Sequence, residues 1–433
     1  MPLYVKEIRG VVNSEIVNEF ASNLGTSIGN FLGSCSTVVV GRDMGDPSQM
    51  IKRSISSGLM AAGINVLDFG IAPIPAINYG KKLYGAKAVV TVTASHIRPD
   101  DITIKIFSDH DIPLEQRHVE RVHWNDIGRL IYVHDYKELY IRNLLDNIDV
   151  ELIKSRFPKI VLDCAQGMMM PFTPAIFNKL ECETIITGSD HSGKIYRFPQ
   201  PSPETLSLIC ELVKTTGSDM GIAIDNDRDR VVFIDETGNI LRDQTVLAIF
   251  AREALKENPG GVVVTSVVAS MSLDEVVSEN NGKLIKSALD LVLNDTLDEN
   301  AIFGGDEPGM YVFPQVNMSF DAIYASIKML EIICKSGKTL SNLAADIKEY
   351  HRNVFSVECE HTKKAAVIDS LKKYYEGKGD LTLVDGFQVD LGDSIVIVRP
   401  SRFDPLIRVY LEAKSPEKLQ ILIQEVNKLI QEL

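Results

Sequence analysis

Short apolar runs rich in β-branched residues alternate along this chain with longer amphipathic stretches. This alternation is typical of α/β folds, in which helices cover the faces of a sheet. The runs are of two kinds. One kind ends in a small-residue turn, at 37–41, 159–163 and 261–265, and the other delivers polar residues to a loop, at 88–93, 221–224 and 301–304. Because the two kinds alternate three times, the sequence predicts three related α/β units in tandem.

The end of the chain has a different pattern. Residues 389–398 and 406–411 alternate as strands, and residues 416–433 have the periodicity of an amphipathic helix. Two earlier helices are expected at 48–62 and 320–336, each followed by a glycine. Since 433 residues are too many for one core, we expect three α/β domains and a smaller C-terminal α+β domain. Their predicted ranges are 1–138, 139–243, 244–348 and 349–433.

Composition and charge argue against several classes of binding partner. A net charge of −14 argues against a surface for nucleic acid or an anionic membrane. The six cysteines are scattered without a Cys-x-x-Cys pair, so we expect neither a zinc site nor a disulfide framework. The first residues lack the pattern of a signal peptide, and no apolar stretch is long enough to span a bilayer. We therefore expect a cytoplasmic protein that binds neither nucleic acid nor membrane.

Three carboxylates alternate in one short loop between two apolar runs. Asp225, Asp227 and Asp229 follow residues 221–224 and precede residues 231–234. Such close acids repel one another unless a cation lies among them, and hard oxygen ligands suit Mg²⁺ or Ca²⁺. Arg230 adds a guanidinium that fits a phosphate. The loop therefore indicates phosphoryl transfer.

Two other readings of the acidic loop stay open. Its acids can be solvated turn residues. A calcium EF-hand loop is the second alternative, because Glu236 stands at its twelfth position, but Arg230 occupies the sixth position, where that loop needs glycine.

A serine stands where the strand 88–93 meets its loop. Ser95 is a candidate nucleophile or phosphate carrier, and His96 and Lys105 are candidate acid–base or charge-stabilising groups. The alternative is an ordinary polar turn. No Gly-x-Ser-x-Gly elbow is present, which disfavours an α/β-hydrolase.

Two later loops carry candidate substrate-binding residues. Asp306 and Glu307 follow two glycines and can bind sugar hydroxyls, or they can belong to a plain Gly/Pro turn. A basic loop near the C-terminus can clamp a phosphate, or can be a surface hairpin whose arginine stems cover apolar area. Its candidate residues are Arg399, Ser401, Arg402 and Arg408.

Taken together and in this order, the four loops resemble those of the α-D-phosphohexomutase superfamily, and the resemblance covers essentially the whole chain. It implies a four-domain enzyme around a central cleft, in which Ser95 carries a phosphoryl group. Mg²⁺ would be held by Ser95, Asp225, Asp227 and Asp229.

The same resemblance implies a phosphosugar mutase. Such an enzyme moves a phosphoryl group between the anomeric and terminal hydroxyls of a sugar monophosphate, through a sugar bisphosphate that also serves as activator. His96 and Lys105 would move protons, Arg230 would supply charge, and Arg9 and Arg42 match basic positions of the family.

The sequence departs from the family pattern in the loops that would bind the sugar and its non-reacting phosphate. The usual Gly-Glu-x-Ser-Gly-His becomes residues 305–310 here, with Asp306, Pro308 and Met310 in place of the acid, the serine and the histidine. A site that lacks a hydrogen bond to a hydroxyl loses its power to select for that hydroxyl. We therefore expect a sugar other than glucose or mannose, such as a pentose or an unusual hexose.

Three other functions are also compatible with these residues. A phosphosugar phosphatase would use the same serine, and a kinase-like transferase is disfavoured because no Walker-type phosphate loop is present. A non-catalytic paralogue that binds a phosphosugar or a protein partner is the third. Whether the protein is a monomer or a homo-oligomer is also open.

Overall fold

The computed structural model describes residues 3–94, 100–113, 119–164, 172–188, 203–402 and 404–431. The chain forms two compact units. Unit 1 comprises Met1–Leu241, Leu297–Asn300 and Pro308–Leu343, and unit 2 comprises Arg242–Thr296, Ala301–Glu307 and Ala344–Leu433. Within these described ranges, none of the helices has the length and apolarity needed to cross a bilayer.

Unit 1 begins with a six-stranded sheet in the order β1-β5-β4-β2-β3-β6, in which only β5 runs against its neighbours. The strands are β1 (Tyr4–Val11), β2 (Thr37–Arg42), β3 (Asn65–Ile71), β4 (Ala88–Ala94), β5 (Asp101–Ser108) and β6 (Leu130–Tyr132). The helices packed around it are α1 (Asn18–Leu32), α2 (Asp46–Ala61) and α3 (Ile74–Tyr84). The predicted helix 48–62 is confirmed as α2, and Gly63 follows it with a φ of +80°.

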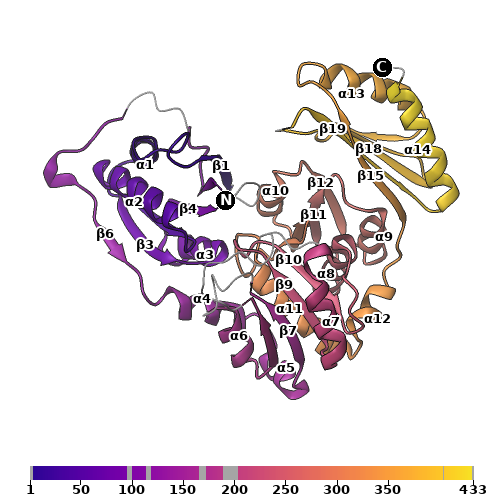
Figure 1. Ribbon diagram of the computed structural model, residues 1–433, viewed down its shortest axis with the longest axis horizontal. Coiled ribbons are helices and arrows are strands. Elements are labelled where there is room, and N and C mark those ends of the chain that lie inside the picture. The colour runs from indigo at the N-terminus through magenta and orange to yellow at the C-terminus, as the bar shows by residue number, and fades with distance from the viewer. Residues whose placement is uncertain are drawn as a thin grey trace. The chain divides into compact units, whose positions relative to one another are not determined.

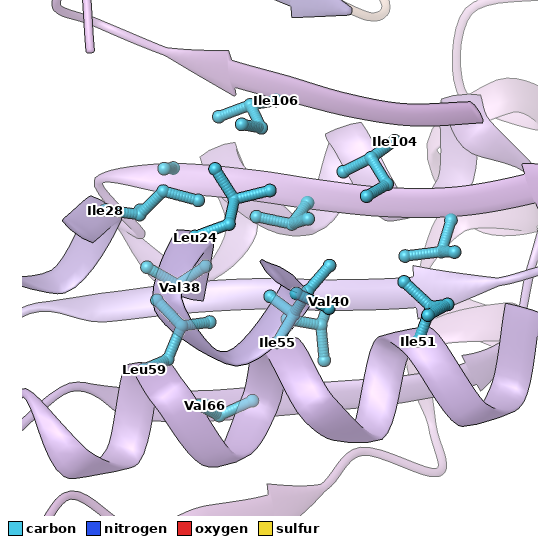
Figure 2. Close-up of a cluster of buried hydrophobic side chains, with 14 of the residues drawn as sticks. Leu24, Ile28, Val38, Val40, Ile51, Ile55, Leu59, Val66, Ile104 and Ile106 are labelled. Carbon is cyan, nitrogen blue, oxygen red and sulfur yellow. The ribbon is translucent and has the colours of Figure 1, made fainter. Parts of the chain in front are cut away.

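A continuous apolar core joins α1 and α2 to the first sheet. Leu24 of α1 and Ile55 of α2 lie against Val38 and Val40 of β2, and all four are fully buried. Figure 2 shows how these side chains fill the space between the helices and the strands. The β-branched run at residues 37–41 is thus a strand, and it forms one side of this core.

The two helices cross at glycines. A Cβ atom on Gly58 would lie 1.9 Å from the carbonyl oxygen of Ser22, and one on Gly25 would lie 2.2 Å from that of Ile55. At this crossing Thr26 Oγ1 donates to the carbonyl oxygen of Gly58 at 3.2 Å. The backbones can therefore approach this closely only because both positions lack a side chain.

The rest of unit 1 holds a four-stranded sheet in the order β10-β9-β7-β8. Its strands are β7 (Lys159–Asp163), β8 (Glu183–Thr187), β9 (Met220–Ile224) and β10 (Val231–Asp235). Helices of this part are α4 (Tyr136–Leu145), α5 (Val150–Arg156), α6 (Thr173–Lys179), α7 (Ser207–Thr216) and α11 (Ala322–Ser336). Shorter elements found elsewhere in unit 1 are η1 (Trp124–Asp126), η2 (Pro203–Thr205) and β14 (Met310–Val312).

The predicted helix 320–336 is confirmed as α11. Asp321 caps it by accepting a hydrogen bond from Tyr324 N at 2.9 Å, and Gly337 ends it in the left-handed conformation. Asp321 also accepts from the buried Tyr140 hydroxyl of α4, at 2.9 Å and 2.8 Å to its two oxygens. This late helix is therefore tied to an element nearly two hundred residues earlier in the chain.

Unit 2 combines a parallel sheet with an antiparallel one. The parallel strands are β11 (Val262–Ser266), β12 (Lys283–Ser287) and β13 (Phe303–Asp306), with helices α8 (Asp243–Glu257), α9 (Met271–Glu279) and α10 (Val292–Asp298). The antiparallel sheet has the order β15-β19-β18-β17-β16. Its strands are β15 (His351–Glu358), β16 (Asp380–Thr382), β17 (Phe387–Asp390), β18 (Ser394–Pro400) and β19 (Leu406–Ala413). After α12 (Leu340–Ala345), helices α13 (Lys364–Tyr375) and α14 (Pro416–Gln431) cover one face of this last sheet (Figure 1).

The four sheets confirm the predicted fold class, because α/β parts are followed by a smaller C-terminal α+β part. The prediction of one strand over 389–398 is wrong. A tight turn divides it into β17 and β18, because Gly392 has a φ of +85° and donates its N–H to Asp390 Oδ1 at 2.7 Å.

We predict that Gly58→Ala lowers the free energy of unfolding by about 1–3 kcal/mol, because the added methyl group forces α1 and α2 apart. Urea unfolding followed by circular dichroism measures the change. Ser57→Ala, an exposed neighbour on the same helix, is the matched control and should unfold like the parent protein. Equal stability of the two variants would show that the helices do not depend on this close approach.

Candidate active site

The acidic loop lies where the antiparallel strands β9 and β10 meet, with Ile224 opposite Val231. Asp225 N donates to the carbonyl oxygen of Arg230 at 3.1 Å, and Arg230 N donates to Asp225 Oδ1 at 3.2 Å. The loop is thus closed across its base. Its three aspartates, Asp225, Asp227 and Asp229, have little exposure, so their charges are largely removed from water.

The structure brings Lys105 to this loop. Its Nζ lies 3.0 Å from Asp229 Oδ2 and 3.6 Å from Asp227 Oδ2. Lys105 stands in β5 opposite Glu7 of β1 and Thr91 of β4, so the first sheet holds the base of its side chain. The geometry therefore brings Lys105 to the aspartates, a contact that the sequence did not specify.

Burial and charge together set the pKa values of these groups. Burial raises the pKa of Asp225 well above its ordinary value, and the charges of Asp229 and Asp227 add to the effect. Burial also raises the pKa of Asp227 to about 6, although Lys105 opposes it. For Asp229, Lys105 and Arg230 outweigh burial, so its pKa is lowered. Burial alone would lower the pKa of Lys105, but Asp229 and Asp227 raise it overall, which keeps the side chain an ammonium.

Arg228 holds the loop in shape, a role that the sequence did not indicate. Its guanidinium is 1% exposed and donates to the carbonyl oxygens of Asp225 and Cys164. Its φ of +63° lies in the left-handed region, where a side chain is strained. The buried hydrogen bonds of its guanidinium offset this strain.

Ser95 and His96 lie outside the described residues. The last described residue before them, Ala94, donates its N–H to Asp43 Oδ2 at 2.6 Å. Asp43 Oδ1 accepts from Gly45 N at 2.9 Å, so one buried carboxylate joins the ends of β2 and β4. On β4, Thr93 Oγ1 donates to Asp227 Oδ2 at 3.4 Å, which places this strand end beside the acidic loop. Arg9 pairs with Glu7 on β1.

The fit of the loop to a divalent cation follows from its donors. In the described ranges, no group of three or more His, Cys, Asp and Glu side chains is arranged to hold a metal ion, and the nearby cation is Lys105. The donor set still suits a hard cation, because three buried carboxylates share one loop. Asn226 Oδ1 is also buried there without a hydrogen-bond partner among the described residues. Asp225, Asp227 and Asp229 therefore stay the predicted ligands, together with Ser95.

In unit 2, the two predicted sugar-binding acids have separate partners. Asp306, at the end of β13, accepts from Ser266 Oγ and from Glu307 N. Glu307 Oε1 accepts from Gln244 Nε2 at 2.7 Å and from Arg352 Nη1 at 2.8 Å. Burial raises the pKa of Asp306 to about 7, with a contribution from Glu307, and burial also raises the pKa of Glu307 to about 7 against the opposing charge of Arg352.

Arg352 was missed by the sequence reading, because nothing marks its long-range partners. Its Nη2 donates to the carbonyl oxygen of Val268 at 2.9 Å, and its guanidinium lies 5.4 Å from the centre of the Tyr410 ring. It therefore links β15 to the loop that carries Glu307.

The predicted phosphate loop joins β18 to β19. Arg399 and Arg408 stand directly opposite each other in these strands, so they share one face of the sheet. Arg399 pairs with Asp385 at 2.8 Å, Arg408 Nη2 lies 3.8 Å from Asp404 Oδ2, and Ser401 Oγ donates to Asp404 Oδ2 at 3.1 Å. Arg402 is mostly exposed and pairs with Asp290.

Buried Lys364 supports the phosphate loop and is a second residue that the sequence did not reveal. At the start of α13, its Nζ donates to the carbonyl oxygens of Ser401 at 2.7 Å and Asp404 at 2.6 Å. Both ends of the loop are thus tied to the helix.

Comparison with known families finds three matches in tandem. Residues 3–124, 138–238 and 242–350 match the models for α/β/α domains I, II and III of phosphoglucomutase/phosphomannomutase. The predicted domain borders are close to these ranges but stay predictions.

Similar proteins match over nearly the full length. A phosphoglucomutase/phosphomannomutase of Thermococcus kodakarensis is 33% identical, with 98% of this chain and 97% of that protein covered. A probable phosphoglucosamine mutase of Methanopyrus kandleri is 33% identical, with 96% and 95% covered. A solved phosphoglucomutase/phosphomannomutase family protein of Burkholderia thailandensis has the same fold, with a TM-score of 0.86 at 23% identity over 98% of this chain and 96% of that one.

We predict that Asp306→Asn removes a pH dependence of stability. The pKa of Asp306 is 3.8 ordinarily and about 7 in the folded state, so only the folded protein keeps this proton between those values. The parent protein should therefore lose stability relative to the variant as pH rises from about 4 to about 7, by at most about 1.4 kcal/mol per pH unit. Above about pH 7 the difference should stay constant.

Denaturant unfolding at pH 5, 6, 7 and 8 measures this difference. Asp380→Asn, which changes an exposed aspartate of the same unit, is the control. Parallel pH profiles for the parent protein and Asp306→Asn would contradict the prediction.

Proposed function

Since this chain belongs to the phosphoglucomutase/phosphomannomutase family of isomerases, we propose that it is a mutase that moves a phosphoryl group between the anomeric and terminal hydroxyls of a sugar monophosphate. The observation that carries this proposal is the pairing of Lys105 with the acidic loop beside the strand end that leads to Ser95. Phosphoryl transfer depends on charge neutralisation and positioning, and these residues supply both.

The proposed reaction begins with a phosphoryl group on Ser95. A hydroxyl oxygen of the sugar phosphate attacks the phosphorus, and the bond from phosphorus to Ser95 Oγ breaks. Because Lys105 is held as an ammonium, we assign it to stabilising the negative charge that develops on the transferred group. His96 is assigned to accepting the hydroxyl proton and later returning it to a leaving oxygen. The second half repeats the step in reverse with the other phosphate.

Asp225, Asp227 and Asp229 would hold Mg²⁺, on which this family generally depends. The ion would neutralise charge on the phosphoryl oxygens. Arg230 lies close enough to affect the pKa values of Asp225 and Asp229, so its guanidinium is part of the same electrostatic cluster. A sugar bisphosphate would serve as activator, because it can phosphorylate Ser95 when the intermediate is lost.

Unit 2 is proposed to recognise the substrate. Arg399 and Arg408 share a face of the sheet and present two positive charges to the non-reacting phosphate. Asp306 is proposed to accept from a sugar hydroxyl. Glu307 is already engaged by Arg352 and Gln244, so we propose that it supports the loop more than it contacts the sugar.

The sugar itself is proposed from the loop's chemistry. Pro308 and Met310 offer no side-chain hydrogen-bond donor, so fewer hydroxyls can be read at this loop. A pentose phosphate or an unusual hexose phosphate fits this reduced set. Glucosamine phosphate belongs on the same panel, because similar proteins carry the name phosphoglucosamine mutase.

We predict that Ser95→Ala lowers mutase turnover by at least about a thousandfold, since the phosphoryl carrier is removed. The assay follows transfer between terminal and anomeric positions by phosphorus NMR, with Mg²⁺ and a trace of the matching bisphosphate. The panel comprises glucose, mannose, glucosamine, ribose and deoxyribose monophosphates. Ser155→Ala, which is exposed on α5, is the matched control and should retain activity.

The outcomes separate the candidate functions. Release of inorganic phosphate without isomerisation would replace the mutase by a phosphatase. Isomerisation that survives in Ser95→Ala would overturn the phosphoserine mechanism.

We also predict that a chelator abolishes turnover and that added Mg²⁺ restores it. Asp227→Asn should raise the Mg²⁺ concentration for half-maximal activity at least about tenfold, because one charged ligand becomes neutral. Asp126→Asn, an exposed change in the same unit, should leave that concentration unchanged. Full activity in the chelated protein would count against the metal assignment.

A further inference from the structure

Unit 1 contains a cavity that Arg42 lines but that the described catalytic candidates Arg9, Lys105 and Arg230 do not. It has a volume of about 510 Å³ and lies along one face of α2, beside β3 and β6. This size is within the range of pockets that hold small ligands. We call it the α2 cavity.

One part of the α2 cavity is cationic. Arg42, Lys52 and Arg53 line it, and Asp68 is the one acidic lining residue. Lys52 Nζ lies 2.5 Å from both oxygens of Asp68, so this buried pair is internally neutral. The positive charges left over are therefore those of the two arginines.

Neither arginine has a carboxylate at ion-pair distance within the parts of the chain that the structure describes. Arg42 Nη1 donates to the backbone carbonyl oxygens of Asp43 and Gly45, at 2.6 Å and 3.5 Å. Arg53 is exposed and takes part in none of the ion pairs of these residues. Two guanidinium groups thus share one cavity, although the protein as a whole has a net charge of −14. Guanidinium groups bind phosphate oxygens in a fork, and the hydroxyls of Ser56 and Ser57 line the same cavity.

Another part of the cavity is apolar. Met60, Ala61, Ile127 and Leu130 line it, and the ring of Tyr132 completes the lining. Tyr132 and Ile127 are 62% and 51% exposed, so these groups are available to a ligand. A ligand that fills the cavity should therefore combine an anionic group with an apolar or planar body.

We propose that the α2 cavity binds a small organic phosphate, with the phosphate at Arg42 and Arg53 and the organic body against Tyr132 and its apolar neighbours. The binding is separate from the proposed catalytic reaction and does not rest on it.

Calorimetric titration of the full chain with phenyl phosphate tests the proposal. The catalytic site also accepts phosphates, so the comparison between variants isolates the α2 cavity. Arg53→Glu should weaken one class of binding at least about tenfold or remove it, since a charge-assisted hydrogen bond is replaced by repulsion. Lys82→Glu makes a comparable change of charge at an exposed position on α3 outside the cavity and should bind like the parent protein.

A second variant tests the organic half of the ligand. Tyr132→Ala should weaken the binding of phenyl phosphate while leaving that of inorganic phosphate unchanged. Equal affinity and stoichiometry in the parent protein, Arg53→Glu and Lys82→Glu would overturn the proposal. Mutase turnover of Arg53→Glu without added ligand should match the parent value, which distinguishes loss of this binding from failure of the catalytic reaction.

Discussion

The contact between the Lys105 ammonium and the buried aspartates of the β9–β10 loop is the interaction on which the candidate site depends. Three carboxylates within five residues would repel one another strongly in an environment of low dielectric constant. One cation from β5 offsets that repulsion and also ties the first sheet of unit 1 to the second. The same lysine is thus a structural counter-charge before substrate arrives and a charge stabiliser in the proposed reaction.

The antiparallel sheet of unit 2 also brings like charges together, but here the charges are positive. Arg399 and Arg408 are cross-strand neighbours, an arrangement that costs stability when the charges are alike. Asp385 and Asp404 reduce the cost only in part, since Arg408 and Asp404 are 3.8 Å apart and both are well exposed. If a phosphate binds here as proposed, it would complete the neutralisation, and its binding would stabilise the sheet.

Much of the fold could be predicted because it follows local rules. Helix α2 and helix α11 are periodic stretches that end near a glycine, and the strands of the three α/β parts are β-branched runs. The failure at 389–398 has a local cause too, since a turn at Gly392 can hide inside an alternating pattern. The supporting residues of the site could not be predicted in this way. Arg228, Arg352 and Lys364 act through partners that are distant in sequence or through backbone carbonyl groups, and single-sequence patterns carry no signal for either.

The path of the chain through its two units has a consequence for synthesis. Unit 1 includes residues 308–343, although unit 2 begins at residue 242. Asp321, which caps α11, is the partner that satisfies the buried hydroxyl of Tyr140. A growing chain that has just left the ribosome at residue 243 therefore still lacks α11, and the part of unit 1 around the second sheet stays incomplete until roughly a hundred more residues have emerged. The core of the first sheet, by contrast, comprises only residues up to 130, so it can form as soon as these residues have emerged.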